Sequence, residues 1–430
     1  MKKITLILSI IYLWVFSACC EIINFDIFAT TDIHGNFHHG KSGIIALANF
    51  FEQNGRSENS ILIDCGDLIQ GNAVNRLEKG ELIIQGINLL QYDFLVPGNH
   101  DFDFGYEAMR QAFSASTAEI LMANLQVENL KSVPFKIVEK SGVKFGFIGM
   151  TERNLRWRFP TQKALKFIDN DTALKNAVKS LMKSKVDIIV LIMHDGLYFR
   201  GGTIFEIIKK FPMIDIVIGG HTHQVEHGKK IRKSYFIQSE PFGKGIGQLK
   251  IEFDTTSRKI RRIKSEIHLL ENYDASDIPQ QFKSLNEKYK KLTQEAAQPL
   301  QIDTKYFRED LSLQENLALS AMKNYAPDGD VYLNLLGREV SKEYHINNIN
   351  QYTLKKILFY EDIYTIIEIN QKDLPLILSE VEQSSKKFNS KLLYVTEDSC
   401  RSKSKIRLVT TWYIAGGMGK SDSKIRKLCQ

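Results

Sequence analysis

The sequence predicts an α/β protein with two domains. The chain has 430 residues, which is more than one hydrophobic core usually supports. Its composition, 43% hydrophobic and 25% charged, is ordinary for a globular protein and does not indicate disorder. Apolar runs that fit buried β-strands recur through the first half, and each leads into a short polar motif.

Five apolar runs are expected to be these strands. They are INFDIFATT, ILID, FLVP, VDIIVLI and IDIVI, at residues 23–31, 61–64, 94–97, 186–192 and 214–218. Each is followed by a polar motif, in order DIHG (32–35), GDLIQG (66–71), GNHDFDFG (98–105), MHDG (193–196) and GGHTH (219–223). In open α/β sheets, ligands collect at the carboxyl ends of the strands. We therefore expect the five motifs to meet at one edge of the sheet.

The motifs contain the residue types that bind divalent metal ions. Two carboxylates, one amide and four imidazoles are candidate ligands: Asp32, Asp67, Asn99, His34, His194, His221 and His223. Oxygen and imidazole ligands without a thiolate suit Zn, Mn, Fe, Co or Ni, and the set is large enough for two ions. Asp67 is the best candidate for a bridge between them, and Gly66 and Gly98 let the backbone approach the ions.

The five motifs resemble the signature blocks of the calcineurin-like metallophosphoesterases, specifically the two-domain 5'-nucleotidase family. The stretch PFGKGIGQLKIEFD (241–254) also resembles the end of that family's catalytic domain. The resemblance implies a four-layer α/β/β/α sandwich with a smaller α+β C-terminal domain. It also implies that the seven candidate ligands hold two metal ions, and that His100 and Asp103 form a catalytic dyad.

The dyad is also chemically reasonable. Two metal ions can clamp a phosphoryl group and make hydroxide available near neutral pH. His100 would then stabilise or protonate the departing oxygen, while Asp103 holds the imidazole in the useful tautomer. The alternative is that Asp103 only caps the helix that follows.

The expected domain organisation has four parts. Residues 1–19 form a signal peptide, residues 22–256 the catalytic domain, residues 277–300 a linking helix, and residues 301–430 a shortened, divergent substrate domain. The linking helix is predicted from a polar, helix-favouring stretch without glycine. In the last part, helix-like LSLQENLALSAMKNYA (311–326) alternates with strand-like runs such as DVYLNLL (330–336).

The family resemblance also places candidate substrate residues in the second domain. FYED (359–362) and TWYIAGGMG (411–419) look like the blocks that supply two rings for stacking the base, which would be Tyr360 and Trp412. Asn334 is retained from a third block. Met418 replaces an aspartate of the family pattern and Asp362 an asparagine. The alternative is that both rings are core aromatics of an eroded domain.

The amino terminus has the form of a secretory signal. Lys2 and Lys3 precede an apolar run at residues 4–16, which is too short to be a good membrane anchor by itself. The sequence FSAC resembles a bacterial lipobox ending at Cys19, with plain signal cleavage as the alternative. We therefore expect an exported protein, periplasmic or at the cell surface, with membrane association through a lipidated Cys19.

The charge of the chain does not predict a nucleic-acid polymer as partner. The formal net charge is +7, and basic residues gather between Lys386 and Lys427. Aromatic residues are not interleaved with these bases as they are in dedicated nucleic-acid surfaces.

Together these features predict a phosphohydrolase that uses two metal ions to release phosphate from nucleotides, as a 5'-nucleotidase does. Two alternatives within the class are a 2',3'-cyclic nucleotide 2'-phosphodiesterase/3'-nucleotidase and a nucleotide-diphosphate hydrolase. An alternative from another class is a surface protein whose metal site serves binding without turnover.

Overall fold

The apolar runs of the first half form two six-stranded β-sheets. The structure is a computed structural model that describes residues 21–153, 155–157, 159, 163–198, 203–273, 276–336, 344–358, 364–388, 390–397, 400 and 403–415. The first sheet has the order β14-β13-β1-β2-β3-β4. Its strands are β1 (Ile22–Thr30), β2 (Ser60–Asp64), β3 (Phe94–Leu95), β4 (Glu119–Ile120), β13 (Gly245–Asp254) and β14 (Lys259–Leu269).

The second sheet has the order β11-β12-β10-β9-β7-β6. Its strands are β6 (Phe135–Lys140), β7 (Val143–Met150), β9 (Ile188–Met193), β10 (Ile216–Ile218), β11 (Glu226–Ile231) and β12 (Ser234–Gln238). In each sheet the central strands run parallel, so their carboxyl ends share one edge. A small third sheet pairs β5 (Leu125–Val127) with β8 (Leu165–Phe167).

Successive residues of a strand point to opposite faces of its sheet. Each large sheet therefore has one apolar face that packs against the other sheet and one that packs against helices. In β9, Ile188, Val190 and Ile192 belong to the core between the sheets. The alternate residues Ile189 and Leu191 belong to a second core, which packs the sheet against helices. A strand that is buried on both faces is apolar throughout, which explains the continuous run at residues 186–192.

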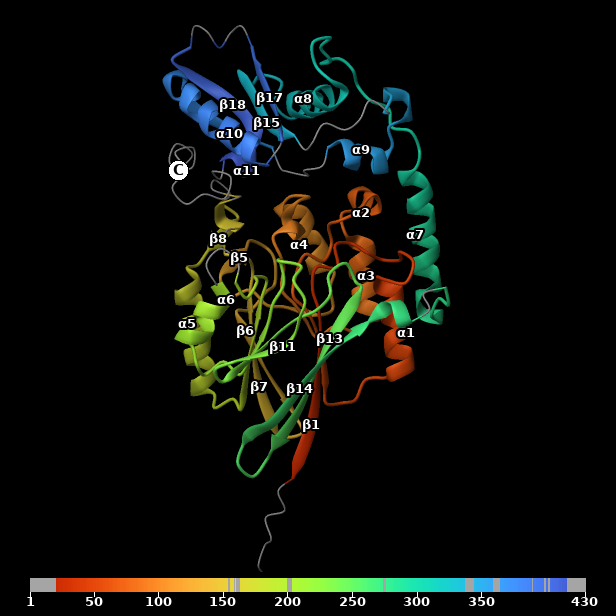
Figure 1. Ribbon diagram of the computed structural model, residues 1–430, viewed down its shortest axis with the longest axis vertical. Helices are drawn as coiled ribbons and strands as arrows, with labels where there is room; N and C mark the ends of the chain where they lie inside the picture. Colours follow the sequence, from red (N-terminus) through yellow and green to blue (C-terminus); the bar gives the residue numbers. More distant parts are fainter. Residues whose placement is uncertain are drawn as a thin grey trace, which may run out of the picture.

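Helices cover the outer face of each sheet (Figure 1). The first sheet packs against α1 (Ile44–Asn54), α3 (Glu81–Leu89) and α4 (Tyr106–Ser114). The second packs against α5 (Asn170–Lys183) and α6 (Thr203–Lys210). The short α2 (Ala73–Glu78) lies between the GDLIQG motif and α3. The result is the expected four-layer α/β/β/α sandwich.

The first sheet continues beyond the expected end of the catalytic domain. β14 pairs antiparallel with β13 from Gly245↔Leu269 to Asp254↔Lys259. The expected boundary at residue 256 therefore falls in the turn of a β-hairpin. Polar and basic residues alternate with isoleucines along β14, because this edge strand has one solvated face.

The segment expected to link the domains contains the helix α7 (Lys283–Ala296). The helix packs along the first domain: the Tyr289 hydroxyl donates to the carbonyl oxygen of His38 at 3.0 Å, and Lys288 pairs with Glu81 at 2.8 Å. Beyond it, the Leu300 amide donates to the Ile349 carbonyl oxygen at 2.6 Å. The linking segment therefore contacts both lobes of the molecule.

The second lobe contains a four-stranded sheet of order β16-β18-β15-β17 with helices on both faces (Figure 1). Its helices are α8 (Leu313–Tyr325), α9 (Gln351–Ile357), α10 (Leu374–Phe388) and α11 (Trp412–Ala415). Its strands are β15 (Val331–Leu336), β16 (Tyr364–Asn370), β17 (Lys391–Thr396) and β18 (Lys405–Thr411). α8 begins at a capping box in which Ser312 and Glu315 satisfy each other's amides.

No helix in the described part of the chain is long and apolar enough to cross a membrane. The expected signal peptide and Cys19 lie outside the described residues.

Candidate metal centre

The five polar motifs meet at the edge where the parallel strands of both large sheets end. β1, β2 and β3 of the first sheet lead into the motifs at 32–35, 66–71 and 98–105. β9 and β10 of the second sheet lead into those at 193–196 and 219–223. The motif loops are also hydrogen-bonded to one another, because the Asp32 amide donates to Gly66 and the His34 amide to Asp67, both at 2.8 Å. Residues far apart in sequence are thereby held together.

Six of the candidate ligands form two groups that can each hold a metal ion. We call them the outer cluster, which is Asp32, His34 and His223, and the inner cluster, which is Asp67, His194 and His221. Within each cluster the ligand atoms lie within 4.8 Å of one another. Oδ2 of Asp67 lies 3.1 Å from Nε2 of His194 and 3.9 Å from Nε2 of His34. Asp67 therefore sits between the clusters, where a bridging ligand is expected.

The amide ligand candidate, Asn99, lies in the same loop region and is 8% exposed. The amide of the next residue, His100, donates to Oδ1 of Asp67 at 2.7 Å. This bond brings the loop at residues 98–105 against the inner cluster.

The backbone of the ligand residues is unusual. Five of the six have a left-handed φ, between 49° and 70°: Asp32, His34, Asp67, His221 and His223. Such a conformation costs on the order of 1–3 kcal/mol for each non-glycine residue and persists only where the surroundings enforce it. Strained backbone concentrated on these residues indicates a functional site.

Two glycines make room for the ligands at the inner cluster. A Cβ atom on Gly98 would lie 2.2 Å from Oδ1 of Asp67, and one on Gly66 would lie 2.7 Å from Nδ1 of His194. Gly66 also has a φ of 95°, which a larger residue adopts only with strain. The glycines thus allow the loops to close around Asp67 and His194.

Hydrogen bonds orient two of the imidazoles toward the space between the clusters. Nδ1 of His194 lies 2.6 Å from the Cys65 carbonyl oxygen, and Nδ1 of His34 lies 3.2 Å from that of Gln70. A ring that donates through Nδ1 presents Nε2 as the acceptor. Nε2 of His34 faces Nε2 of His223 at 3.2 Å. Nε2 of His223 also lies 3.3 Å from Oδ1 of Asp32, so two imidazole nitrogens and a carboxylate oxygen face one another at a point that suits a cation.

Buried polar atoms support the same conclusion at the inner cluster. Oδ2 of Asp67 and Nε2 of His194 are buried and face each other, and the described part of the chain offers them no other hydrogen-bond partner. Carboxylate oxygen and imidazole nitrogen are the donor types that Zn, Mn, Fe, Co and Ni accept. The residues present therefore fit two divalent metal ions, without distinguishing among these metals.

The charges of the inner cluster are strongly coupled. Burial alone would raise the pKa of Asp67, but the neighbouring His194 and His100 hold it well below its usual range. Burial would lower the pKa of His194, yet Asp67 raises it to about 10. Burial and His194 together lower the pKa of His221 to about 3. Without metal, these shifts favour a protonated His194 beside an ionised Asp67, and a bound cation would take the place of that proton.

His100 and Asp103 are in direct contact beside the clusters. Nδ1 of His100 lies 2.7 Å from Oδ2 of Asp103. The His100 side chain is 41% exposed, whereas that of Asp103 is 2% exposed. The helix that follows, α4, begins after Gly105, which has no side chain to cap it. The contact between Asp103 and His100 is the one that a dyad requires.

Sequence reasoning missed Asp101, which organises the inner cluster. Its two carboxylate oxygens accept hydrogen bonds of 2.7–3.0 Å from the amides of four residues: Asp67, Leu68, Ile69 and Gly98. Burial and the charge of Asp67 raise the pKa of Asp101 to about 7, although the hydrogen bonds from the Ile69 and Gly98 amides lower it. The available signal was a carboxylate inside a glycine-containing loop, where several buried amides need an acceptor.

Of the three expected substrate residues, only the Asn334 side chain is described. Asn334 is 8% exposed in the middle of β15, on the sheet face that carries Tyr332 and Leu336 and packs against α8. Trp412 is the first residue of α11, but its side chain is outside the described part, as is the whole of Tyr360. Met418 and Asp362 are also outside it.

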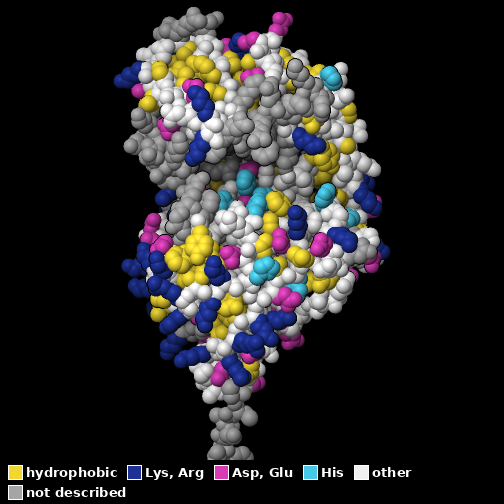
Figure 2. Space-filling view, viewed as in Figure 1, with side chains coloured by type: hydrophobic (Ala, Val, Ile, Leu, Met, Phe, Trp, Pro, Cys, Tyr) yellow, Lys and Arg dark blue, Asp and Glu magenta, His cyan; other side chains and the backbone are white. Residues whose placement is uncertain are grey.

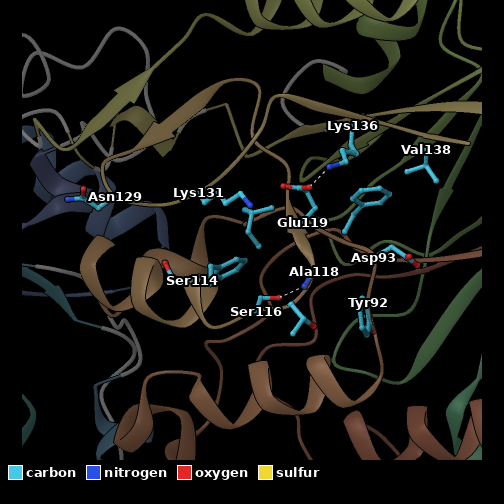
Figure 3. A pocket seen from close by; sticks show the side chains of 14 residues that line it. Tyr92, Asp93, Ser114, Ser116, Ala118, Glu119, Asn129, Lys131, Lys136 and Val138 are labelled. Carbon is cyan, nitrogen blue, oxygen red and sulfur yellow. Dashed lines mark hydrogen bonds and ion pairs between the residues drawn. The ribbon is translucent and has the colours of Figure 1, made fainter. Parts of the chain in front are cut away.

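One pocket lies away from the ligand clusters. It has a volume of about 580 Å³ and is lined by residues near the edge strands β4 and β6 (Figure 3). Lys136 and Glu119 form an ion pair of 2.6 Å there. None of the ligand residues lines this pocket, so it is separate from the two clusters.

Histidine side chains gather at the surface where the molecule is hollowed between its two lobes (Figure 2). The ligand loops lie at the end of the sandwich that faces the second lobe (Figure 1). A small molecule bound at the clusters would therefore lie within reach of the second lobe.

Comparison with known sequences identifies the first domain. The calcineurin-like phosphoesterase profile matches residues 25–225. The chain is 28% identical to a 5'-nucleotidase of Rattus norvegicus over 297 residues, which are 57% of this chain and 50% of the relative. It is 30% identical to a 5'-nucleotidase of Homo sapiens over 244 residues, which are 49% of this chain and 41% of the relative. The chain thus spans half or less of these relatives' length.

Solved structures share the two-lobed fold. A 5'-nucleotidase precursor of Thermus thermophilus superposes with a TM-score of 0.62 at 18% identity, covering 92% of this chain and 90% of that one. The NAD nucleotidase of Haemophilus influenzae superposes with a TM-score of 0.59 at 16% identity, covering 94% and 93%. At such identities the likeness concerns the fold alone.

Proposed function

Since residues 25–225 belong to the calcineurin-like phosphoesterase family, we propose that this chain is a phosphohydrolase that uses two divalent metal ions to release phosphate from nucleotides. One observation carries the proposal: two carboxylate–imidazole clusters face each other across Asp67, with the His100–Asp103 pair beside them. The family match and the 5'-nucleotidase relatives support the reaction class.

The six cluster residues would hold the metal ions, and Asn99 is the proposed seventh ligand. When bound, two divalent ions supply polarisation of the phosphoryl oxygens and a nucleophile at neutral pH. Asp67 and Asp32 keep their negative charge near the ions, because neighbouring histidines offset the effect of burial on their pKa values. Asp101 holds the backbone on either side of the site.

His100 is the proposed catalytic acid. Its Nδ1 is engaged by Asp103, which leaves Nε2 as the ring nitrogen that can donate a proton to a leaving oxygen. The ring is accessible, at 41% exposed, and its centroid is 5.5 Å from that of the ligand His34. A group leaving from a phosphoryl centre at the clusters would therefore meet it.

The test is phosphate release by metal-loaded protein from AMP, 3'-AMP, 2',3'-cyclic AMP, a nucleotide sugar and an artificial diester, with a phosphatase added to reveal monoester products. Turnover that is lost in His100→Ala supports the proposal, and the preferred substrate identifies the subclass. His39→Ala is a matched control, because His39 is an exposed histidine of the neighbouring loop and belongs to neither cluster. Two bound metals without turnover on any substrate would favour a binding role.

We also propose that the protein is exported and anchored through Cys19. The proposal is supported by Lys2 and Lys3 before the apolar run at residues 4–16, and by the FSAC sequence that ends it. Labelling of cells with a fatty acid should mark the wild-type chain and not Cys19→Ser. A wild-type chain that carries no label would contradict the anchor.

A further inference from the structure

The ring of Phe242 packs against both imidazoles of the outer cluster. Its centroid lies 5.3 Å from that of His34, with the ring planes 30° apart. It lies 4.8 Å from that of His223, with the planes at 77°. The two imidazoles are 5.2 Å apart. The three rings therefore form a closed triangle, in which a movement of one imidazole is limited by the other and by the phenyl ring.

The backbone of Phe242 contacts the third member of the cluster. Its amide donates to the carbonyl oxygen of Asp32 at 2.6 Å, and its own carbonyl oxygen accepts from the side-chain amide of Asn36 at 2.7 Å. Phe242 thus touches all three residues of the outer cluster. Phe242 lies in the loop between β12 and β13, about 200 residues after Asp32 in the sequence.

Packing in a hydrophobic core does not explain Phe242. The side chain is 39% exposed. The residue has a φ of 59°, which is an outlier for a bulky residue and costs on the order of 1–3 kcal/mol. Glycine would avoid this strain, and the next residue is indeed Gly243 with the same φ of 59°. A strained, exposed aromatic ring at this position suggests a role for the ring itself.

His223 is the ligand that most needs such support. His34 and His194 are each oriented by a carbonyl oxygen next to Nδ1. For His223, the described part of the chain provides no hydrogen bond to Nδ1, and 36% of the side chain is exposed. Metal-binding histidines are normally fixed by an outer contact of this kind. The His223 ring instead makes an edge-to-face contact with Phe242.

We propose that Phe242 is a positioning residue for the metal ion of the outer cluster. Its ring holds His34 and His223 with their Nε2 atoms turned toward a common point, and its amide fixes the backbone of Asp32. This proposal rests on the two-metal site of the proposed function and adds the residue that sets the affinity of one ion and not the other. The inner cluster makes no ring contact with Phe242 among the described residues.

Two variants separate the ring from the backbone. Phe242→Gly removes the ring but retains the amide and carbonyl groups, in a conformation that glycine adopts freely. Phe242→Tyr retains the ring and adds a hydroxyl at an exposed position. Tyr394→Ala is a control that removes an exposed aromatic ring from the second lobe.

The experiment is a titration of each metal-free protein with Mn²⁺, followed by calorimetry and by electron paramagnetic resonance. The wild type should take up two equivalents and give the signal of a coupled pair. Phe242→Gly should keep one site unchanged and bind the other about 10- to 100-fold more weakly, as found when outer contacts of metal ligands are lost. At Mn²⁺ concentrations that fill only the stronger site, this variant should give the electron paramagnetic resonance signal of an isolated ion. Phe242→Tyr and Tyr394→Ala should behave as the wild type.

The outcomes distinguish this proposal from the proposed function. Fewer than two equivalents in the wild type would contradict the two-metal site and both proposals with it. Two equivalents of unchanged affinity in Phe242→Gly would overturn the role of Phe242 alone. Equal weakening of both sites, or a Phe242→Tyr variant as weak as Phe242→Gly, would also overturn it. The unchanged inner site serves as an internal measure that the variant is folded.

Discussion

The inner and outer clusters have the same composition but are built differently. Each combines one aspartate with two histidines. In the inner cluster Asp67 and His194 are fully buried, whereas the outer cluster has the exposed His223. Both clusters have backbone support: the Cys65 carbonyl and the amides bound by Asp101 at the inner one, and the Gln70 carbonyl beside His34 at the outer one. The exposed ring of Phe242 packs against the two imidazoles of the outer cluster.

This difference indicates that the two metal ions should differ in affinity and exchange rate. A buried, preorganised ligand set holds its ion with little rearrangement, whereas a set with a solvent-exposed imidazole must order that side chain on binding. We therefore expect the inner ion to bind first and the outer ion to exchange more readily.

The largest expected effect comes from a residue that belongs to neither cluster. His100→Ala should lower kcat by about 10²- to 10⁴-fold, the usual contribution of a positioned acid or base. It should leave both metal affinities close to those of the wild type, because His100 is outside both ligand sets. Steady-state kinetics and metal analysis of the same sample provide the measurement. A variant that loses metal together with activity would show that His100 acts as a ligand.

Removing one histidine from each cluster sharpens the comparison. In the metal-free protein His194→Ala leaves the buried Asp67 carboxylate without its balancing charge, which should destabilise the fold by about 3–5 kcal/mol. His223→Ala removes a partly exposed partner of the buried Asp32, but the Thr31 hydroxyl and the His221 amide still donate to that carboxylate, so the loss should be smaller, about 1–2 kcal/mol. Urea unfolding of both variants measures the difference. Equal effects would mean that the clusters are equally integrated in the fold.

Asp101→Asn tests whether the inner cluster depends on backbone support. The side-chain carbonyl oxygen of the variant can accept hydrogen bonds from some of the four backbone amides. Its side-chain NH2 group, which is itself a donor, would face the others. We expect a loss of about 1–3 kcal/mol in the free energy of unfolding, the usual cost of leaving buried donors unsatisfied. Metal binding at the inner site should weaken by about 10- to 100-fold with the outer site less affected. The metal affinities are measured by calorimetric titration. A larger loss of affinity at the outer site than at the inner site would contradict the prediction.

A partly buried carboxyl group at the far end of the sandwich should give the stability of the fold a pH dependence. Burial raises the pKa of Asp215, at the start of β10, to about 6, although the Ile189 amide donates to it. The folded state therefore binds more protons than the unfolded state between about pH 4 and 6, and the stability that this group contributes falls as pH rises through that range. Asp215→Asn should flatten this part of the stability curve. The measurement is urea unfolding at several pH values. If the free energy of unfolding depends on pH equally in the variant and the wild type, Asp215 is not responsible.

The strands and the ligand motifs were predictable because both depend on local sequence. A strand buried on both faces is a continuous apolar run, and residues 186–192 and 214–218 match β9 and β10 closely. The ligand motifs were visible because each begins where such a run stops. β14 was not assigned to the catalytic domain, since its alternating pattern beyond residue 256 reads as a polar segment until its pairing with β13 is known.

The supporting residues could not be predicted because their roles arise between distant segments. Asp101 satisfies amides from a loop more than 30 residues earlier, and Phe242 contacts ligands from both ends of the first domain. The left-handed φ of Asp32 and Asp67 has no local signature either, as these residue types adopt many conformations. The aromatic residues Tyr360 and Trp412 remain predictions.

The measurement that tests the account most directly is a stepwise titration of metal-free wild-type protein with Mn²⁺, with phosphate release from the preferred nucleotide measured at each step. We expect two binding steps of different affinity, and turnover that develops with the second. A single step, no binding, or full turnover with one ion bound would contradict a phosphohydrolase built on two unequal metal sites.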